Sequence, residues 1–338
     1  MLPKEDLDRI SNYYRYHNLD LKSKSFLISG ATGFVGSWVL ESLLHLNRAY
    51  NLGITVTGIT RNTERAKEII DFYNDSNLNF ITEDIRFLKN IDGDFTHVVH
   101  AATPTTARAR DGDIKNLFES SVIGARNLIK IAESQPSPPV FLHTSSGAVY
   151  GRQPLSLKAI PITSARKEFA KSAVIQNEYA RAKVETEKII EFGTRNGSIF
   201  GINARLFAFM GPRLPLNEHY AIGNFLYSGL YENEIRIHGD GQTVRSYQYA
   251  SDMTSQLIYL FGAGNPGNFH IGSDDGKKLI EWANLVGIEC KKPVSVLNSD
   301  PTPASRYVPE RDNRIPRGQG EDIPISEHIG RWRDWISL

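Results

Sequence analysis

Short apolar runs alternate with longer amphipathic segments along most of the chain. The runs read as strands, and the segments with apolar residues at helical spacing read as helices. Strands are expected at residues 26–28, 54–59, 79–81, 98–100, 140–143 and 201–206, and helices at about 38–44, 64–73, 113–133 and 177–193. This alternation predicts an α/β fold, with a doubly wound parallel sheet covered by helices on both faces.

A glycine-rich turn joins the first expected strand to the first expected helix. Small residues let the chain turn tightly, so that backbone N–H groups at the start of the helix can bind a pyrophosphate. A motif in this position predicts a dinucleotide site in a Rossmann-type sheet. The residues expected against the dinucleotide in this turn are Gly30, Thr32, Gly33, Phe34, Val35 and Gly36.

The end of the second expected strand bears on which dinucleotide binds. An acidic residue there would bind the ribose hydroxyls of NAD and repel the 2′-phosphate of NADP. The segment reads Thr57-Gly-Ile-Thr-Arg61-Asn62 and contains no acid. Because the guanidinium of Arg61 can bind a phosphate through paired hydrogen bonds, the expected cofactor is NADP(H).

Both ends of the chain depart from the alternation. Residues 1–22 are expected to form a polar leader with one helix that packs on the body. Beyond Met210 the rhythm breaks, and Gly211-Pro-Arg-Leu-Pro215 has the prolines of an irregular loop. The stretch 293–320, rich in Pro, Arg, Asp and Asn, is expected to be a long surface excursion before a last helix.

With 338 residues, the chain is long enough for a Rossmann core and a smaller appended lobe. We expect the dinucleotide-binding domain to comprise residues 23–208 and about 245–275. A smaller C-terminal α/β lobe, from about 209–244 and 276–338, is expected to bind the substrate.

Composition excludes several other classes of protein. The net charge of +1 predicts no general attraction to nucleic acid or to an anionic membrane. Cys290 is the only cysteine, and no Cys/His cluster has zinc-ligand spacing, so neither a disulfide nor a metal is expected. No stretch approaches the ~18 apolar residues of a membrane span, and the first residues do not resemble a secretory signal. We expect a cytoplasmic enzyme.

Candidate acid-base chemistry lies in the middle of the chain. Tyr179 and Lys183 are four residues apart, so a helix places both on one face. A neighbouring ammonium stabilises a phenolate and lowers the pKa of the phenol towards the working range. Hydroxyl residues up to Ser146 follow a predicted strand, at the edge where open α/β sheets place their ligands.

In combination, the motifs of residues 24–275 resemble those of the extended short-chain dehydrogenase/reductase family. This family includes nucleotide-sugar epimerases, dehydratases and ketoreductases. The motifs are Gly30-x-x-Gly33-x-x-Gly36, His100-Ala101-Ala102, Ser146 before Val149-Tyr150-Gly151, and Tyr179-x-x-x-Lys183.

The resemblance implies roles for individual residues. Tyr179 would be the general acid/base, Lys183 would hold the nicotinamide ribose, and Ser146 would donate a hydrogen bond to the reacting oxygen. Ser121 receives no role, because the family more often has Asn at its position. The residues implied against the rest of the cofactor are Asp84 and Ile85, at the adenine, and Ala101, Ala102 and Thr103.

The implied substrate is a nucleotide-diphosphate sugar. Arg245 matches the arginine with which members of the family hold the diphosphate, and a planar guanidinium suits a phosphate. Arg213 and Asn224 lie in the variable substrate loop. Thr103, Ser146 and Gly147 are also expected to contact the substrate. The family usually pairs through the helices near residues 113–133 and 177–193, so a homodimer is expected.

Several reactions remain open within the family. Members that dehydrate the sugar carry Asp-Glu directly after the matching Ser or Thr, and this chain has Gly147-Ala148, which disfavours a dehydratase. A 4-ketoreductase, a 4-epimerase and a UDP-glucuronate decarboxylase then compete. A non-catalytic nucleotide-binding regulator is disfavoured, because Ser146, Tyr179 and Lys183 are all intact.

A net reductase draws on the NADPH pool, whereas an epimerase or decarboxylase recycles a tightly held NAD. Arg61 therefore favours reduction of the C4 ketone of a nucleotide-linked 4-keto-6-deoxyhexose. Within the resemblance, a dTDP-4-keto-6-deoxyglucose reductase is the expected type of enzyme, and the 4-epimerase or decarboxylase is the alternative.

Overall fold

The structure is a computed structural model, which describes residues 1–103, 114–166, 168, 178–218, 220–300, 302–317 and 323–337. Its centre is a seven-stranded sheet of order β11-β6-β5-β4-β1-β2-β3, in which all neighbours pair in parallel. The predicted doubly wound parallel sheet is therefore confirmed. The strands are β1 (Ser25–Ser29), β2 (Thr55–Thr60), β3 (Leu78–Thr82), β4 (His97–His100), β5 (Val140–Ser146), β6 (Phe200–Leu206) and β11 (Gly267–Ile271).

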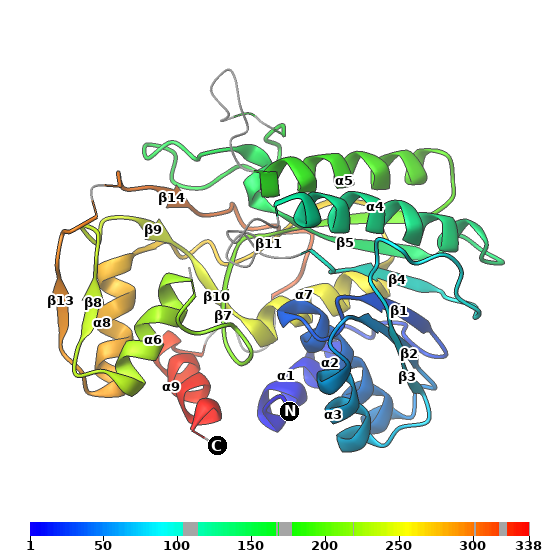
Figure 1. The fold of residues 1–338 in the computed structure, drawn as a ribbon, viewed down its shortest axis with the longest axis horizontal. Coiled ribbons are helices and arrows are strands. Elements are labelled where there is room, and N and C mark those ends of the chain that lie inside the picture. Colours follow the sequence, from blue (N-terminus) through cyan, green and yellow to red (C-terminus); the bar gives the residue numbers. More distant parts are fainter. Residues whose placement is uncertain are drawn as a thin grey trace.

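Helices cover both faces of this sheet (Figure 1). α4 (Ile114–Glu133) and α5 (Glu178–Arg195) pack together on one face. α2 (Phe34–Tyr50) and α7 (Ala250–Ala263) pack together on the other, where α3 (Thr63–Tyr73) also lies. The homodimer expected through α4 and α5 stays a prediction.

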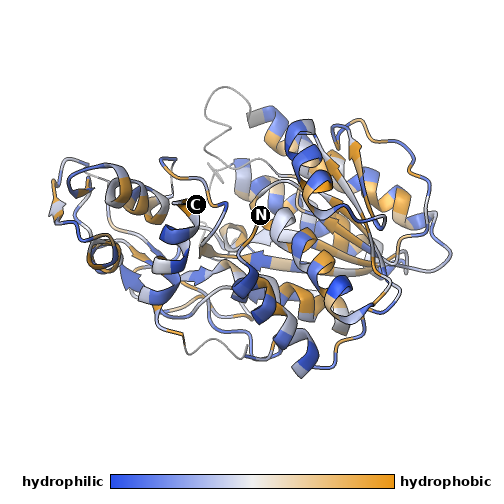
Figure 2. Cartoon of the chain, turned by 90° about the horizontal axis from the view of Figure 1, so that it is seen from below, coloured by the Kyte–Doolittle hydropathy of each residue, from blue (hydrophilic) through white to orange (hydrophobic). Residues whose placement is uncertain are grey.

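Burial on both faces explains the composition of the central strands. In β1, Phe26, Leu27 and Ile28 are fully buried, and parallel strands covered by helices read as continuous apolar runs for this reason. Figure 2 shows the strands of this sheet largely in the hydrophobic colour, between helices of mixed colour. Within the described ranges, no helix is both long and apolar enough to cross a membrane.

A second group of elements lies beside the carboxyl edge of the sheet (Figure 1). Its hydrophobic cluster includes Trp282 and Trp332, both buried. Its helices are α6 (Ala221–Tyr231), α8 (Leu279–Cys290) and α9 (Ile325–Ile336). Its short strands are β7 (Ala208–Met210), β8 (Ile235–Ile237), β9 (Val244–Arg245), β10 (Tyr247–Tyr249), β12 (Lys277–Lys278), β13 (Val294–Val296) and β14 (Arg306–Tyr307). Of these, β7 and β10 link the group to the large sheet. The domain bounds given above stay predictions.

The leader forms the helix α1 (Lys4–Tyr16), which packs against α2 and α7. Its buried apolar side chains are Leu7, Ile10, Tyr13 and Tyr14. The Asp6 carboxylate, also buried, accepts a hydrogen bond of 2.9 Å from the Tyr249 hydroxyl and lies 3.5 Å from the Arg331 guanidinium of α9. The leader therefore joins the large sheet to the last helix.

The expectation that residues 293–320 form a surface excursion is wrong for part of this stretch. Strand β14 pairs with β9, with Tyr307 opposite Arg245. Val308 and Ile315 are buried. The pairing joins segments about sixty residues apart, and local composition carries no sign of such a distant partner.

Candidate active site

The carboxyl ends of β1, β2, β4 and β5 open into one pocket of about 720 Å³. Open α/β sheets bind their ligands at this edge. The pocket brings together most of the residues that the sequence assigns to cofactor and substrate. They are Gly30, Thr32, Gly33, Phe34, Val35, Gly36, Arg61, Asp84, Ile85, Ala101, Ala102, Thr103, Ser146, Tyr179, Lys183, Arg213 and Arg245.

The glycine-rich turn forms one wall of the pocket. Gly30 has φ of +69°, and a Cβ on it would lie 2.7 Å from the carbonyl oxygen of Ala101. A Cβ on Gly36 would overlap the carbonyl of Gly30. Only glycine therefore lets the turn pass so close to the strand beside it, which leaves the N-terminus of α2 open to the pocket. Backbone N–H groups and the helix dipole suit this wall to a pyrophosphate.

The ends of β2 and β3 form the region expected to hold the adenosine. Thr60, the last residue of β2, shares a hydrogen bond of 2.6 Å with Thr32 of the turn. Arg61 follows, with a side chain 58% exposed and Nη1 3.6 Å from the Asp84 carboxylate. Asp84 also accepts hydrogen bonds from Arg86, which lowers the pKa of its carboxyl most strongly. The exposed guanidinium of Arg61 thus borders the pocket beside an ionised carboxylate.

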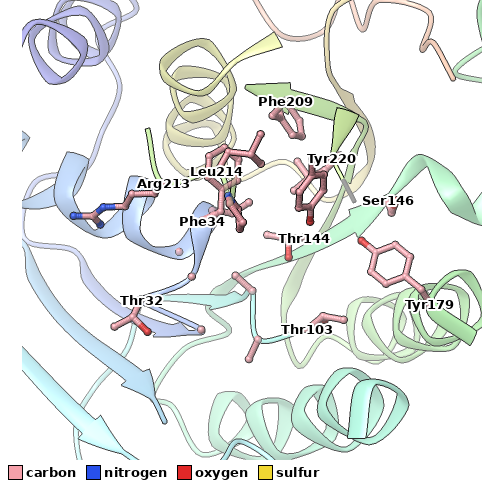
Figure 3. A pocket seen from close by; sticks show the side chains of 18 of the residues that line it. Thr32, Phe34, Thr103, Thr144, Ser146, Tyr179, Phe209, Arg213, Leu214 and Tyr220 are labelled. Atoms are coloured by element: carbon pink, nitrogen blue, oxygen red, sulfur yellow. The ribbon is translucent and has the colours of Figure 1, made fainter. Parts of the chain in front are cut away.

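Tyr179 lies in the first turn of α5, and its hydroxyl points towards Ser146 at the end of β5 (Figure 3). Burial raises the pKa of the Tyr179 phenol, nearby Tyr307 raises it further, and the hydrogen bond with Ser146 lowers it in part. At neutral pH the phenol keeps its proton, which it can donate to an oxygen in the pocket.

Lys183 stands one helical turn after Tyr179 and is buried. Its ammonium donates to the Thr144 carbonyl oxygen at 2.6 Å and to the Thr103 hydroxyl at 3.0 Å. The Nζ atom lies 5.5 Å from the centroid of the Tyr179 ring. Burial lowers the pKa of Lys183 to about 7, although the Glu187 carboxylate opposes this shift. A charged amine so near the ring would stabilise a phenolate.

Arg245, in β9 of the second group of elements, also lines the pocket. Its Nη1 donates to the Val244 carbonyl oxygen at 2.8 Å, and its Nη2 donates to the Ser305 hydroxyl at 2.9 Å. Burial lowers the pKa of its guanidinium. Among the described residues, no carboxylate forms an ion pair with Arg245. A partly buried cation without a protein anion is suited to an anionic ligand.

Three residues expected at the substrate have other surroundings. Arg213 lines the pocket, but its guanidinium forms an ion pair with Glu41 of α2 and points away from Ser146 and Tyr179 (Figure 3). Asn224, in α6, and Gly147, at the start of the short 3-10 helix Gly147–Tyr150, are not among the lining residues. The assignments of these three residues to the substrate stay predictions.

The pocket also has lining residues that the sequence analysis did not single out. Tyr220 precedes α6, and its hydroxyl points towards Thr144 (Figure 3). Phe207 follows β6, and Tyr307 comes from β14. Tyr307 lies in the stretch expected to be a surface excursion, and only the pairing of β14 with β9 brings it to the pocket.

This chain is similar, in both sequence and fold, to enzymes named for nucleotide sugars. The UDP-glucuronic acid decarboxylase 4 of Arabidopsis thaliana is 25% identical over 322 residues, which cover 95% of this chain and 68% of that protein. The fold is similar to that of the UDP-glucuronic acid 4-epimerase from Bacillus cereus in complex with UDP-glucuronic acid and NAD. That pair has a TM-score of 0.74 and 19% identity, and covers 93% of this chain and 99% of the other.

A second solved structure has the same fold. The UDP-N-acetylglucosamine 4-epimerase from Methanobrevibacter ruminantium, in complex with UDP-N-acetylmuramic acid, has a TM-score of 0.76 and 19% identity, with 94% of this chain and 99% of the other covered. The sequence profile of the NAD dependent epimerase/dehydratase family matches residues 26–272, which include the glycine turn, Ser146, Tyr179 and Lys183. The chain therefore belongs to the NAD dependent epimerase/dehydratase family.

Proposed function

We propose that this chain removes a hydride from C4 of a nucleotide-linked sugar and returns it within one catalytic cycle, as a 4-epimerase or a UDP-glucuronate decarboxylase would. The proposed substrate is UDP-glucuronic acid. The observation that carries the proposal is one pocket that joins the glycine turn, the hydroxyls of Tyr179 and Ser146, and the guanidinium of Arg245, which has no carboxylate partner among the described residues. The relatives support it, since the decarboxylase from Arabidopsis thaliana and the epimerase from Bacillus cereus are both named for UDP-glucuronic acid.

The residues of the pocket fit a nicotinamide dinucleotide. The turn at Gly30, Gly33 and Gly36 would hold the pyrophosphate, and Arg61 and Asp84 lie where the adenosine would extend. Lys183 would donate a hydrogen bond to the nicotinamide ribose. When bound, the nicotinamide supplies a hydride acceptor and donor.

The acid-base roles follow from which groups of the site can give up or accept a proton. The oxidation half of the cycle needs the phenolate of Tyr179, which forms when the phenol gives its own proton to solvent and which the charge of Lys183 favours. This phenolate then accepts the proton of the C4 hydroxyl. In the return half, the phenol gives the proton back to the C4 oxygen. Ser146 donates a hydrogen bond to the same oxygen as its charge changes.

The diphosphate of the substrate would be bound by a positively charged side chain. Arg245 would bind the diphosphate through its guanidinium, since it has no anionic partner among the described residues.

The residue after Ser146 is a glycine, so that position offers no carboxyl group to help a hydroxyl leave from the sugar. This absence disfavours a dehydratase.

The test is incubation of the enzyme with UDP-glucuronic acid and a catalytic amount of NAD. We expect product to exceed the added cofactor many times over. Release of carbon dioxide with a UDP-pentose would identify a decarboxylase, and UDP-galacturonic acid would identify a 4-epimerase. Absence of both products, with the nucleotide sugar recovered unchanged, would contradict the proposal for this substrate.

A second candidate is the NADPH-dependent reduction of a nucleotide-linked 4-keto-6-deoxyhexose. Arg61 favours it, because β2 ends in Thr60 without the acid that would select NAD. The test is NADPH oxidation with dTDP-4-keto-6-deoxyglucose, for wild type and Arg61→Ala. A reductase that uses Arg61 would oxidise one NADPH for each sugar reduced, and the variant would lose specificity for NADPH over NADH.

A further inference from the structure

The hydroxyl of Tyr307, in β14, lies beside Ser146 in the candidate active site. Its oxygen lies 3.2 Å from the hydroxyl oxygen of Ser146. Tyr307 stands opposite Arg245 in the pairing of β14 with β9. One short strand pair therefore carries both the cation proposed for the diphosphate and a hydroxyl at the proposed site of hydride transfer.

The space that Tyr307 occupies depends on Gly147. A Cβ on Gly147 would lie 2.5 Å from a ring atom of Phe207 and 2.8 Å from the hydroxyl oxygen of Tyr307. These separations are well below van der Waals contact. A side chain at position 147 would therefore force Phe207 or Tyr307 to shift, and a glycine there leaves room for the Tyr307 hydroxyl beside Ser146.

The hydrogen bonds of Ser146 show what this hydroxyl does. A serine oxygen has two lone pairs and one hydrogen. The Ser146 oxygen accepts from the Ala148 backbone N–H at 3.2 Å. If Tyr307 also donates to it, both lone pairs are used, and the Ser146 hydrogen is free to point at Tyr179 or at a sugar oxygen. The Leu206 carbonyl oxygen, to which Tyr307 could donate instead, is further away at 3.4 Å.

We propose that Tyr307 is a positioning residue, which orients the Ser146 hydroxyl so that its hydrogen points into the pocket at the reacting sugar oxygen. This inference rests on the proposed function, because it takes a sugar oxygen as the group that Ser146 meets. Without the Tyr307 hydroxyl, the Ser146 hydroxyl can rotate, and its hydrogen is no longer directed at the substrate. The main effect is a lower kcat, because the hydrogen bond from Ser146 to the sugar oxygen strengthens as charge develops on that oxygen.

The test is a double-mutant cycle of Tyr307→Phe and Ser146→Ala, with kcat and KM measured on UDP-glucuronic acid. We expect Tyr307→Phe to lower kcat roughly tenfold, the effect of one hydrogen bond, with a smaller, several-fold rise in KM and no change in NAD affinity. In the Ser146→Ala background, Tyr307→Phe should lower kcat by less than about twofold, because Tyr307 acts on the substrate through the Ser146 hydroxyl, which that background lacks.

Tyr150→Phe is the matched control. Tyr150 is buried in the same hydrophobic cluster as Phe207, and its hydroxyl bonds Arg205 and His270 outside the pocket. We expect this variant to lower the melting temperature without the loss of kcat. Tyr307→Phe activity within about twofold of wild type, or an equal loss of activity in both backgrounds, would overturn the positioning role.

Wild-type turnover is measured first, so failure of the proposed function is seen separately. If the wild type turns over neither UDP-glucuronic acid nor dTDP-4-keto-6-deoxyglucose, calorimetric binding of UDP-glucuronic acid and of UDP decides the role of Tyr307. We expect Tyr307→Phe to weaken UDP-glucuronic acid binding several-fold and to leave UDP binding unchanged. An equal ratio of the two affinities in variant and wild type would refute the inference.

Discussion

At the scale of single residues, Tyr179 is the group on which the proposed chemistry depends most directly. Its phenol points to Ser146, and Lys183 lies beside its ring. We expect Tyr179→Phe to lower turnover by about two to four orders of magnitude, the usual contribution of a positioned acid/base. NAD affinity, measured by calorimetry, should stay within about threefold of wild type, because the phenol carries no charge at neutral pH. Near-normal turnover would show that another group moves the proton.

Lys183 allows a prediction on stability. Burial lowers the pKa of Lys183 in the folded chain to about 7, from 10.5 in the unfolded chain. Between these two values the unfolded state binds more protons, so this residue makes the wild type more stable as pH rises through the window. Lys183→Met has no such proton. Its melting temperature relative to wild type should therefore be highest below pH 7 and fall towards pH 10.

Thermal melts of both proteins without cofactor provide the measurement. The loss of the hydrogen bond to the Thr144 carbonyl oxygen shifts the variant at every pH, so only the change with pH reports on the buried charge. A difference in melting temperature that stays constant from pH 6 to pH 10 would mean that Lys183 keeps its ordinary pKa.

At the scale of elements, the sequence predicted six of the seven strands of the large sheet, β1 to β6. The run at residues 26–28 became β1, because buried parallel strands covered by helices have continuous apolar patterns, and the expected strand at 201–206 became β6 within one residue. β11 was not predicted, because its five residues include only two apolar side chains, Phe269 and Ile271. The His270 side chain instead bonds the Tyr150 hydroxyl at 2.6 Å, and that partner is distant in sequence.

Helix α1 provides a prediction at the same scale. The carboxylates of Asp6 and Glu5 both lie 3.5 Å from the Arg331 guanidinium of α9, but the Asp6 side chain is fully buried and that of Glu5 is 78% exposed. Asp6→Ala leaves the Tyr249 hydroxyl and Arg331 without this partner, so we expect a loss of roughly 2–4 kcal/mol in unfolding free energy.

Glu5→Ala is the matched control and should change the unfolding free energy by less than about 0.5 kcal/mol, as exposed ion pairs usually do. Urea unfolding followed by circular dichroism measures both variants. Equal effects of the two substitutions would mean that α1 is held by its apolar side chains alone.

At the scale of the whole molecule, the site combines local motifs with contacts that only the fold creates. The glycine turn, Ser146 and the Tyr179–Lys183 pair were predictable, because each depends on spacing within one strand, turn or helix. The ion pair of Arg213 with Glu41 and the approach of Tyr307 to Ser146 were not. Each joins residues more than one hundred and fifty positions apart, and no periodic pattern links them.

The whole pocket also sets the fate of the hydride. The glycine turn and the Tyr179–Ser146 pair line one continuous cavity, so cofactor and sugar would be held together through both halves of the reaction. UDP-glucuronic acid carrying deuterium at C4 should therefore keep the label in its product, and a pool of unlabelled NAD should gain none. Mass spectrometry of the nucleotide sugar and of the cofactor measures both.

A net reductase behaves differently, because NADPH deuterated at the transferred position would place its label on C4 of the product and be consumed one for one. Transfer of the label from the sugar into free cofactor would contradict recycling and favour the reductase.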